Sequence, residues 1–91
     1  MAILTTFKVS GDPDELFAIE QTYAAEASEV GRANGLISIT IVRTDTGLML
    51  VNVWENEEGM ERTAAHIGPI ASSKGMPAIE DWHKYEVLDR R

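Results

Sequence analysis

Three polar side chains in one short stretch of the sequence are of types that can do chemistry. The stretch VNVWENEEGMERTAAH, residues 51–66, carries Asn52 and Trp54 near its start and His66 at its end. The Asn52 amide and the Trp54 indole can each donate a hydrogen bond to negative charge that develops on a bound molecule. His66 is the only group in the middle of the chain that titrates near neutral pH, which makes it the candidate base.

Each candidate residue also has a purely structural interpretation. The Trp54 ring can serve as core packing, as aromatic rings do in small domains. The Asn52 amide can bond to Thr40 across a hairpin, and His66 can be a partly exposed helix histidine. Tyr23 falls in an apolar helical stripe, where it can either pack in the core or orient a phenolic ligand. Both interpretations of each residue stay open at this level.

The first helix is predicted to start at Pro13 and to end at the segment ANG. Asp12 is a suitable N-cap, Pro13 suits the first helical position, and Glu15 lies at the capping-box position. Gly35 can adopt the left-handed conformation that ends a helix. Apolar side chains at spacings of three and four share one face of this single helix: Leu16, Ile19, Tyr23, Ala27 and Val30. The acidic residues between Asp12 and Glu29 are predicted to form its solvated face, with a surface for a basic partner as the alternative.

A β-hairpin is predicted over LISITIVRTDTGLMLVNVWE, residues 36–55. A three-residue loop of Asp45, Thr46 and Gly47, with Gly47 left-handed, is favoured because it separates aliphatic side chains from the others. In this register Asn52 and Trp54 face away from the helices. A two-residue loop would instead place these two side chains beside the isoleucines.

A second helix is predicted after Asn56, which can act as its N-cap, with acidic residues in its first turn. Met60, Ala64 and Ile67 mark its buried stripe. Pro69 should interrupt this helix, or start a short continuation to Lys74, because proline lacks a backbone donor and restricts the residue before it.

Two further strands are predicted at Ile3 to Val9 and at Trp82 to Leu88, where apolar residues alternate. The order strand, helix, strand, strand, helix, strand is the ferredoxin-like βαββαβ pattern, an α+β fold with a four-stranded antiparallel sheet. Two helices cover only one face of such a sheet, and the other face is expected to be apolar. We therefore expect a homodimer in which the sheets of two chains face each other.

The composition narrows the class of protein. A chain of 91 residues makes one domain, residues 1–91, and its hydrophobic share of 44% is typical of a globular chain. A formal net charge of -7 argues against nucleic acid as a partner. No apolar run is long enough to span a membrane, and the first residues lack the pattern of a secretory signal. Without cysteine, disulfides and thiolate metal sites are excluded, so a cytoplasmic location is expected.

No metal or cofactor is expected from the sequence. His66 and His83 lie far apart, without the His or carboxylate spacing that zinc sites use. There is also no glycine-rich phosphate loop and no nucleophile elbow.

The size, the element order and the stretch VNVWENEEGM resemble the dimeric α/β-barrel superfamily, in particular the antibiotic biosynthesis monooxygenase (ABM)-like proteins. In that family the third strand often ends in a Trp followed by an acidic or polar helix start, which matches Trp54 to Met60. The resemblance implies a cofactor-independent monooxygenase, or an isomerase, acting on an aromatic or polyketide-like small molecule. His66 and Asn52 would be its catalytic residues, and Trp54 and Tyr23 would contact the substrate. A non-catalytic, small-molecule-binding or purely structural homodimer of the same fold is the alternative.

Haem-opening relatives typically use an Asn in the first strand together with a Trp and a His on the second helix. Here the first strand has no Asn and the second helix has no Trp, so His66 alone does not predict a haem site.

Overall fold

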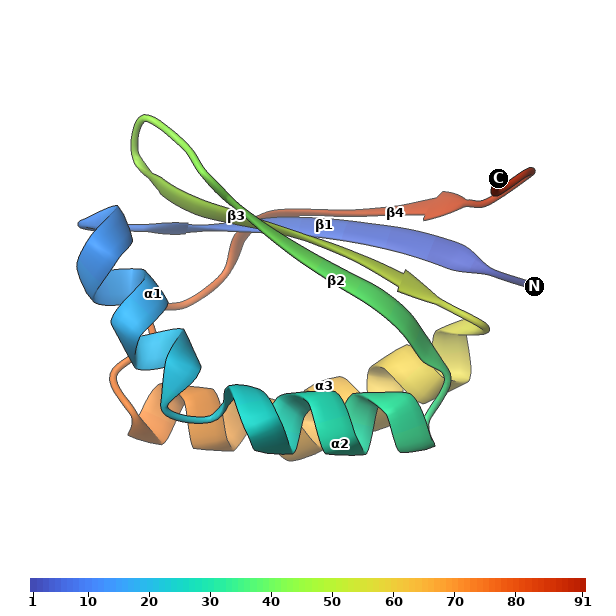
Figure 1. Ribbon diagram of the computed structural model, residues 1–91, viewed down its shortest axis with the longest axis horizontal. Helices are drawn as coiled ribbons and strands as arrows, with labels where there is room; N and C mark the ends of the chain where they lie inside the picture. Colours follow the sequence, from blue (N-terminus) through green and yellow to red (C-terminus); the bar gives the residue numbers. More distant parts are fainter.

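A computed structural model describes residues 1–91 as a sheet covered by helices (Figure 1). The elements along the chain are β1 (Ile3–Ser10), α1 (Pro13–Gln21), α2 (Ala24–Ala33), β2 (Leu36–Arg43), β3 (Gly47–Trp54), α3 (Glu57–Ser73) and β4 (Glu80–Glu86). The strands are antiparallel neighbours in the order β2-β3-β1-β4. The predicted ferredoxin-like α+β fold is confirmed, although β4 begins and ends two residues earlier than the predicted Trp82 to Leu88.

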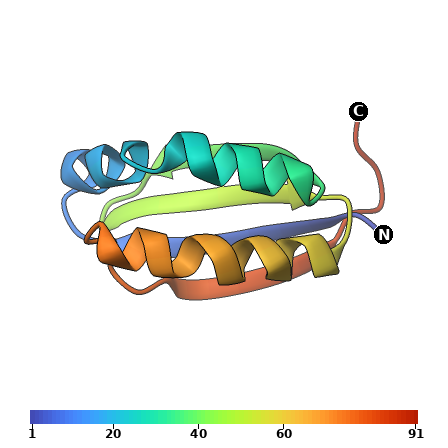
Figure 2. The same ribbon diagram turned by 90° about the horizontal axis from the view of Figure 1, so that it is seen from below.

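The helices all lie on one face of the sheet. Figure 2 shows them in two rows side by side, with α1 and α2 in one row and α3 in the other. The opposite face of the sheet carries no helix (Figure 1). None of the helices combines the length and the apolar character that crossing a membrane requires.

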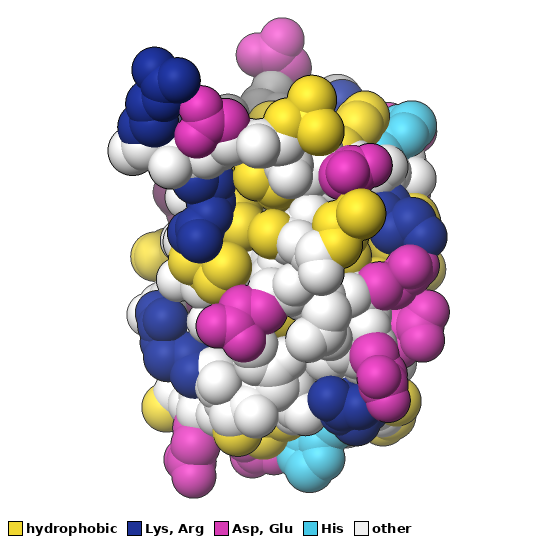
Figure 3. All heavy atoms as spheres, turned by 90° about the vertical axis from the view of Figure 1, so that its right-hand side faces the viewer, with side chains coloured by type: hydrophobic (Ala, Val, Ile, Leu, Met, Phe, Trp, Pro, Cys, Tyr) yellow, Lys and Arg dark blue, Asp and Glu magenta, His cyan; other side chains and the backbone are white.

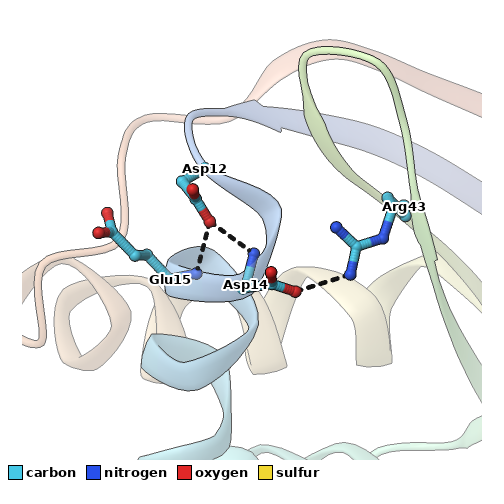
Figure 4. Close-up of polar contacts among 4 residues, drawn as sticks. All are labelled: Asp12, Asp14, Glu15 and Arg43. Atoms are coloured by element: carbon cyan, nitrogen blue, oxygen red, sulfur yellow. Dashed lines mark hydrogen bonds and ion pairs between the residues drawn. The ribbon is translucent and has the colours of Figure 1, made fainter.

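The predicted N-cap of the first helix is confirmed. The Oδ1 atom of Asp12 accepts hydrogen bonds from the backbone N–H groups of Asp14 at 2.9 Å and Glu15 at 3.1 Å (Figure 4). Arg43, at the end of β2, donates from Nη2 to the Asp14 carboxylate at 2.6 Å. This ion pair joins β2 to the start of α1, but both side chains are exposed, so it adds little to stability.

The prediction of a single first helix is wrong, because the chain breaks into α1 and α2 at Thr22 and Tyr23. The Thr22 hydroxyl donates to the Ile19 carbonyl at 2.6 Å. The backbone N–H groups of Thr22 and Tyr23 bond to carbonyls three residues back, at Ile19 and Glu20, instead of four. A hydroxyl that competes for a helix carbonyl and a tighter final turn both end a helix.

The predicted interruption at Pro69 is also wrong, because α3 runs unbroken through this residue. The helix starts as predicted, with the Asn56 Oδ1 atom accepting from the Gly59 N–H at 2.7 Å. Pro69 removes the helical hydrogen bond to the Ala65 carbonyl, on the exposed side of the helix where water can replace it. Gly68 has no Cβ to clash with the proline ring, so the helical conformation before Pro69 is tolerated.

The hairpin has a two-residue loop, so the predicted three-residue loop is wrong. The Thr44 N–H donates to the Gly47 carbonyl at 2.9 Å, and Ile39 lies opposite Asn52. Asn52 and Trp54 therefore share a face with the isoleucines, and this face points toward the helices. A shift of one residue in the register reverses every side chain of a strand.

Gly47 explains why the register differs from the prediction. Its backbone is not left-handed, unlike that of Gly35, which ends α2 as predicted with a φ of 92°. A Cβ atom on Gly47 would instead lie 2.0 Å from the carbonyl oxygen of Val9. The glycine is needed for the close approach of β1 to β3 rather than for the turn.

The buried apolar side chains form two clusters at opposite ends of the interface between sheet and helices. One cluster consists of Ile3, Leu36, Trp54 and Met60, and the other of Val9, Leu16 and Leu48. The middle of the interface, between the clusters, holds a cavity.

Candidate functional site

A cavity of about 440 Å³ lies between the inner face of the sheet and the helices. Side chains from β1, β2 and β3, from the junction of α1 with α2, and from α3 line it, and most of them are hydrophobic. A mainly apolar cavity of this size, with a few polar groups, is typical of a site for a small organic molecule.

The cavity opens to solvent on one side. Its exposed lining residues lie along α3, in the segment between α3 and β4, and on β4: Ala64, Gly68, Ser72, Pro77, Ala78, Ile79 and Trp82. A Cβ atom on Gly68 would meet no other atom within 4 Å, which agrees with open space at this point. A ligand would therefore enter between α3 and the segment that leads into β4.

Asn52 presents an unpartnered polar group to this apolar wall. Its Oδ1 atom is buried and accepts no hydrogen bond. The predicted alternative of a bond to Thr40 is wrong, because Asn52 lies opposite Ile39 and Thr40 is on the other face. An unpaired buried polar group costs about 1–3 kcal/mol, so a ligand that donates to Asn52 would relieve this penalty. The amide Nδ2 can donate to the same ligand.

Trp54 lies in the cavity wall and in a core cluster at once. Its indole Nε1–H donates to the Thr5 hydroxyl at 3.3 Å, and both residues are buried. The indole N–H is therefore engaged within the protein. What Trp54 offers a ligand is the surface of its ring.

Glu20 also lines the cavity, although it is not among the site residues predicted from the sequence. The residue is only 6% exposed, so the prediction of a solvated acidic face is wrong for Glu20, whereas the other acidic residues between Asp12 and Glu29 are exposed as predicted. Its spacing is the signal in the sequence, because Glu20 lies four residues after Leu16 and three before Tyr23, within the apolar stripe. Burial raises the pKa of the Glu20 carboxyl, and the hydrogen bond from Gln21, 2.7 Å long, lowers it to a smaller extent.

Tyr23 lines the same cavity close to Glu20. Burial, together with the negative charge of Glu20, raises the pKa of the Tyr23 phenol to about 12. Tyr23 is therefore neutral over the physiological range and can donate a hydrogen bond to a ligand.

His66 does not line the cavity. Its side chain is 53% exposed on α3, and its Nε2 atom lies 3.2 Å from the Glu26 carboxylate of α2. The interpretation of His66 as a partly exposed helix histidine is confirmed. The structure thus brings Asn52, Trp54 and Tyr23 around one cavity and leaves His66 outside it.

Solved structures resemble this chain over nearly its whole length, whereas no family model and no curated protein matches its sequence. The cofactor-independent oxygenase SnoaB from Streptomyces nogalater has a TM-score of 0.64 at 20% identity, covering 98% of this chain and 93% of SnoaB. A candidate antibiotic biosynthesis monooxygenase from Chloroflexus aurantiacus has a TM-score of 0.72 at 16% identity, covering 100% and 97%. A similar candidate from Nitrosomonas europaea has a TM-score of 0.70 at 13% identity, covering 96% and 90%.

These neighbours define the class of fold. They are ABM-like proteins, so the resemblance predicted from the sequence is confirmed at the level of fold. This chain has the ferredoxin-like α+β fold that ABM-like proteins share. A fold supports many reactions, so the reaction has to be argued from the cavity itself.

Proposed function

We propose that the protein is a cofactor-independent monooxygenase-like protein that binds an aromatic or polyketide-like molecule in the cavity between sheet and helices. The observation that carries the proposal is the unpartnered Asn52 amide in a mainly apolar wall. The presence of a cofactor-independent oxygenase among the fold neighbours supports the same class of reaction.

In such a reaction the substrate itself supplies the electrons. A base removes a proton from an activated CH₂ group, the resulting enolate carbon bonds to O₂, and the peroxide loses water. The net change is R₂CH₂ + O₂ → R₂C=O + H₂O, which needs no cofactor. The Asn52 amide N–H and the neutral Tyr23 phenol are two donors in the wall that can hold the enolate oxygen.

Glu20 is the group in the wall that can accept the proton. Its raised pKa brings the carboxyl closer to neutral pH, where a base is most effective. The predicted base His66 makes no contact with this cavity, so we assign it no part in the reaction.

Oxygen consumption with anthrone tests this proposal, because anthrone is an apolar tricyclic compound with one activated CH₂ group. We expect protein-dependent oxygen uptake that yields anthraquinone. Asn52→Ala should lower kcat/KM by about 10²-fold, as the loss of an oxyanion donor does. His66→Ala is the control and should leave turnover unchanged. Turnover that survives Asn52→Ala, or that is lost in His66→Ala, would contradict the assignment.

Non-catalytic binding of an aromatic molecule is the second candidate function. It is favoured by the engagement of the Trp54 N–H with Thr5, which leaves fewer free donors for catalysis. Binding of anthrone or anthraquinone without any oxygen uptake would support this candidate over the first.

We also propose that the functional form is a homodimer, a dimeric α/β barrel built from the sheet faces that carry no helix. A cytoplasmic location and the lack of a nucleic-acid partner stay predictions from the sequence.

A further inference from the structure

The cavity wall contains an acidic group but no basic group. Glu20 is the only carboxyl group in its wall, and no Lys, Arg or His lines it. The other titratable group in the wall, Tyr23, is neutral at physiological pH. Above its pKa the Glu20 carboxylate therefore places a negative charge in the wall without a cation to balance it.

The Glu20 carboxylate also has unused capacity to accept hydrogen bonds. Gln21 donates to its Oε1 atom at 2.7 Å, and this is the one hydrogen bond that the side chain forms. A carboxylate can accept about four hydrogen bonds, so several acceptor positions are free. A hydroxyl group on a bound molecule could occupy one of them, and hydrogen bonds to an ionised acceptor are stronger than neutral ones.

An anionic ligand would be repelled by the Glu20 carboxylate. Its charge would lie close to Glu20 in a mainly apolar cavity, where charges are screened much less than in water. No cation in the wall could compensate for the repulsion or for the lost hydration of the anion.

We propose that Glu20 is the specificity-determining residue of the cavity: it selects aromatic molecules that carry a hydroxyl donor and rejects those of the same size that carry a carboxylate. This inference rests on the proposed function, because it needs the cavity to bind aromatic molecules. It narrows the substrate class to phenols and to aromatic ketones in their enol form, and it excludes aromatic acids.

Three naphthalene compounds test the inference by isothermal titration calorimetry at about pH 8, a pH above the ordinary pKa of a carboxyl group. They are 2-naphthol, which is neutral, 2-naphthoate, which is anionic, and naphthalene, which has neither group. We expect the unmodified protein to bind 2-naphthol at least about tenfold more tightly than 2-naphthoate, the size of effect that one unpaired charge produces.

Glu20→Gln should reduce this preference about tenfold, mainly because 2-naphthoate binds more tightly once the charge is gone. Glu15→Gln is the matched control: it removes the same charge from the same helix at an exposed position outside the wall, and it should leave the preference unchanged. Glu20→Asp keeps the charge and should keep the rejection of 2-naphthoate. Naphthalene has no group that Glu20 can bond to or repel by charge, so measurable binding of naphthalene to each variant shows that the cavity is intact.

The possible failures are distinguishable. If the naphthalene compounds bind but the preference is the same with and without the Glu20 charge, the inference is overturned and the proposed binding cavity stands. If none of the three compounds binds to the folded protein, the proposed function and the inference are both overturned. A preference for 2-naphthoate in the unmodified protein would also overturn the inference.

Discussion

Glu20 is an acidic residue whose carboxylate has no cation in the cavity wall and accepts a single hydrogen bond, from Gln21. The carboxyl group is buried, and its pKa is raised because burial disfavours the ionised form. The folded state therefore holds the proton more tightly than the unfolded state does. The contribution of Glu20 to stability should fall as the pH rises from 4.5, the ordinary pKa of the carboxyl group, through the raised pKa of the folded state. It should stay at the lower level at higher pH.

Glu20→Gln should accordingly stabilise the protein at neutral pH. The amide keeps the shape of the side chain and the hydrogen bond from Gln21, but it cannot ionise. Its advantage over the unmodified protein should shrink as the pH falls from the raised pKa through 4.5, because below 4.5 the carboxyl is protonated in both the folded and the unfolded state. Urea unfolding midpoints across this range measure the difference. Glu15→Gln, at an exposed position, should show no such pH dependence, and an equal response of both variants would contradict the argument.

The sequence could identify some site residues and not others, for physical reasons. Asn52, Trp54 and Tyr23 are recognisable by residue type and by their place on predicted elements, and all of them line the cavity. His66 is a candidate base by residue type, but its exposure depends on how α3 packs, which the sequence does not reveal. Glu20 is hidden among other acidic residues, and only its position in the apolar stripe distinguishes it.

At the scale of elements, Gly47 shows how packing can override a turn preference. The residue belongs to β3 and lies opposite Ser10, where the backbones of β1 and β3 approach closely. A Cβ atom would lie 2.0 Å from the Val9 carbonyl oxygen, a backbone atom that cannot move without moving β1. We expect Gly47→Ala to lower the free energy of unfolding by about 2–4 kcal/mol, in the upper range of overpacking effects.

Chemical denaturation of Gly47→Ala measures this loss, with Thr46→Ala as its neighbour control. Thr46 is exposed in the same turn, so its replacement should change stability by no more than about 0.5 kcal/mol. If Gly47→Ala were as stable as Thr46→Ala, the close approach of the two strands would not be the reason for the glycine.

Local signals made the element order predictable, whereas contacts distant in sequence decided the details. The Asp12 and Asn56 caps and the end of α2 at Gly35 need only a few adjacent residues. The register of the hairpin depends on β1, which is distant in the sequence and leaves no room for a side chain at Gly47. The break at Thr22 and Tyr23 involves a side-chain hydrogen bond and a tighter backbone turn, which periodicity cannot reveal.

At the scale of the whole molecule, the sheet has one face that no helix covers. Its side chains alternate with those that point to the helices, and many of them are apolar: Leu4, Val42, Met49, Val51, Val53 and Tyr85. Figure 3 shows the end of the molecule at which the chain termini lie. There, charged side chains of both signs spread over the surface, and apolar side chains lie between them.

Because of the cavity, the stability of the fold depends more strongly on burial of the helix-free face. Only 13 of the 91 residues are buried: the middle of the interface between sheet and helices is hollow, and no helix covers the other face of the sheet. A small domain with a divided core is marginally stable, so burial of a second apolar face would contribute a large share of its stability. A second copy of the chain offers a face of the same shape and the same apolar character.

We therefore expect the protein to be a dimer at micromolar concentration in sedimentation equilibrium. Val51→Glu places a carboxylate on β3, an inner strand of the sheet, in the middle of the helix-free face. In a dimer two such charges would lie close together without partners, so this variant should sediment as a monomer. Ala65→Glu adds the same charge to an exposed position of α3 and should leave the dimer intact. Circular dichroism establishes that both variants are folded. A monomeric unmodified protein would exclude the proposed interface. A dimer that survives Val51→Glu and not Ala65→Glu would place the interface elsewhere, because the helix-free face would then not be what holds the two chains together.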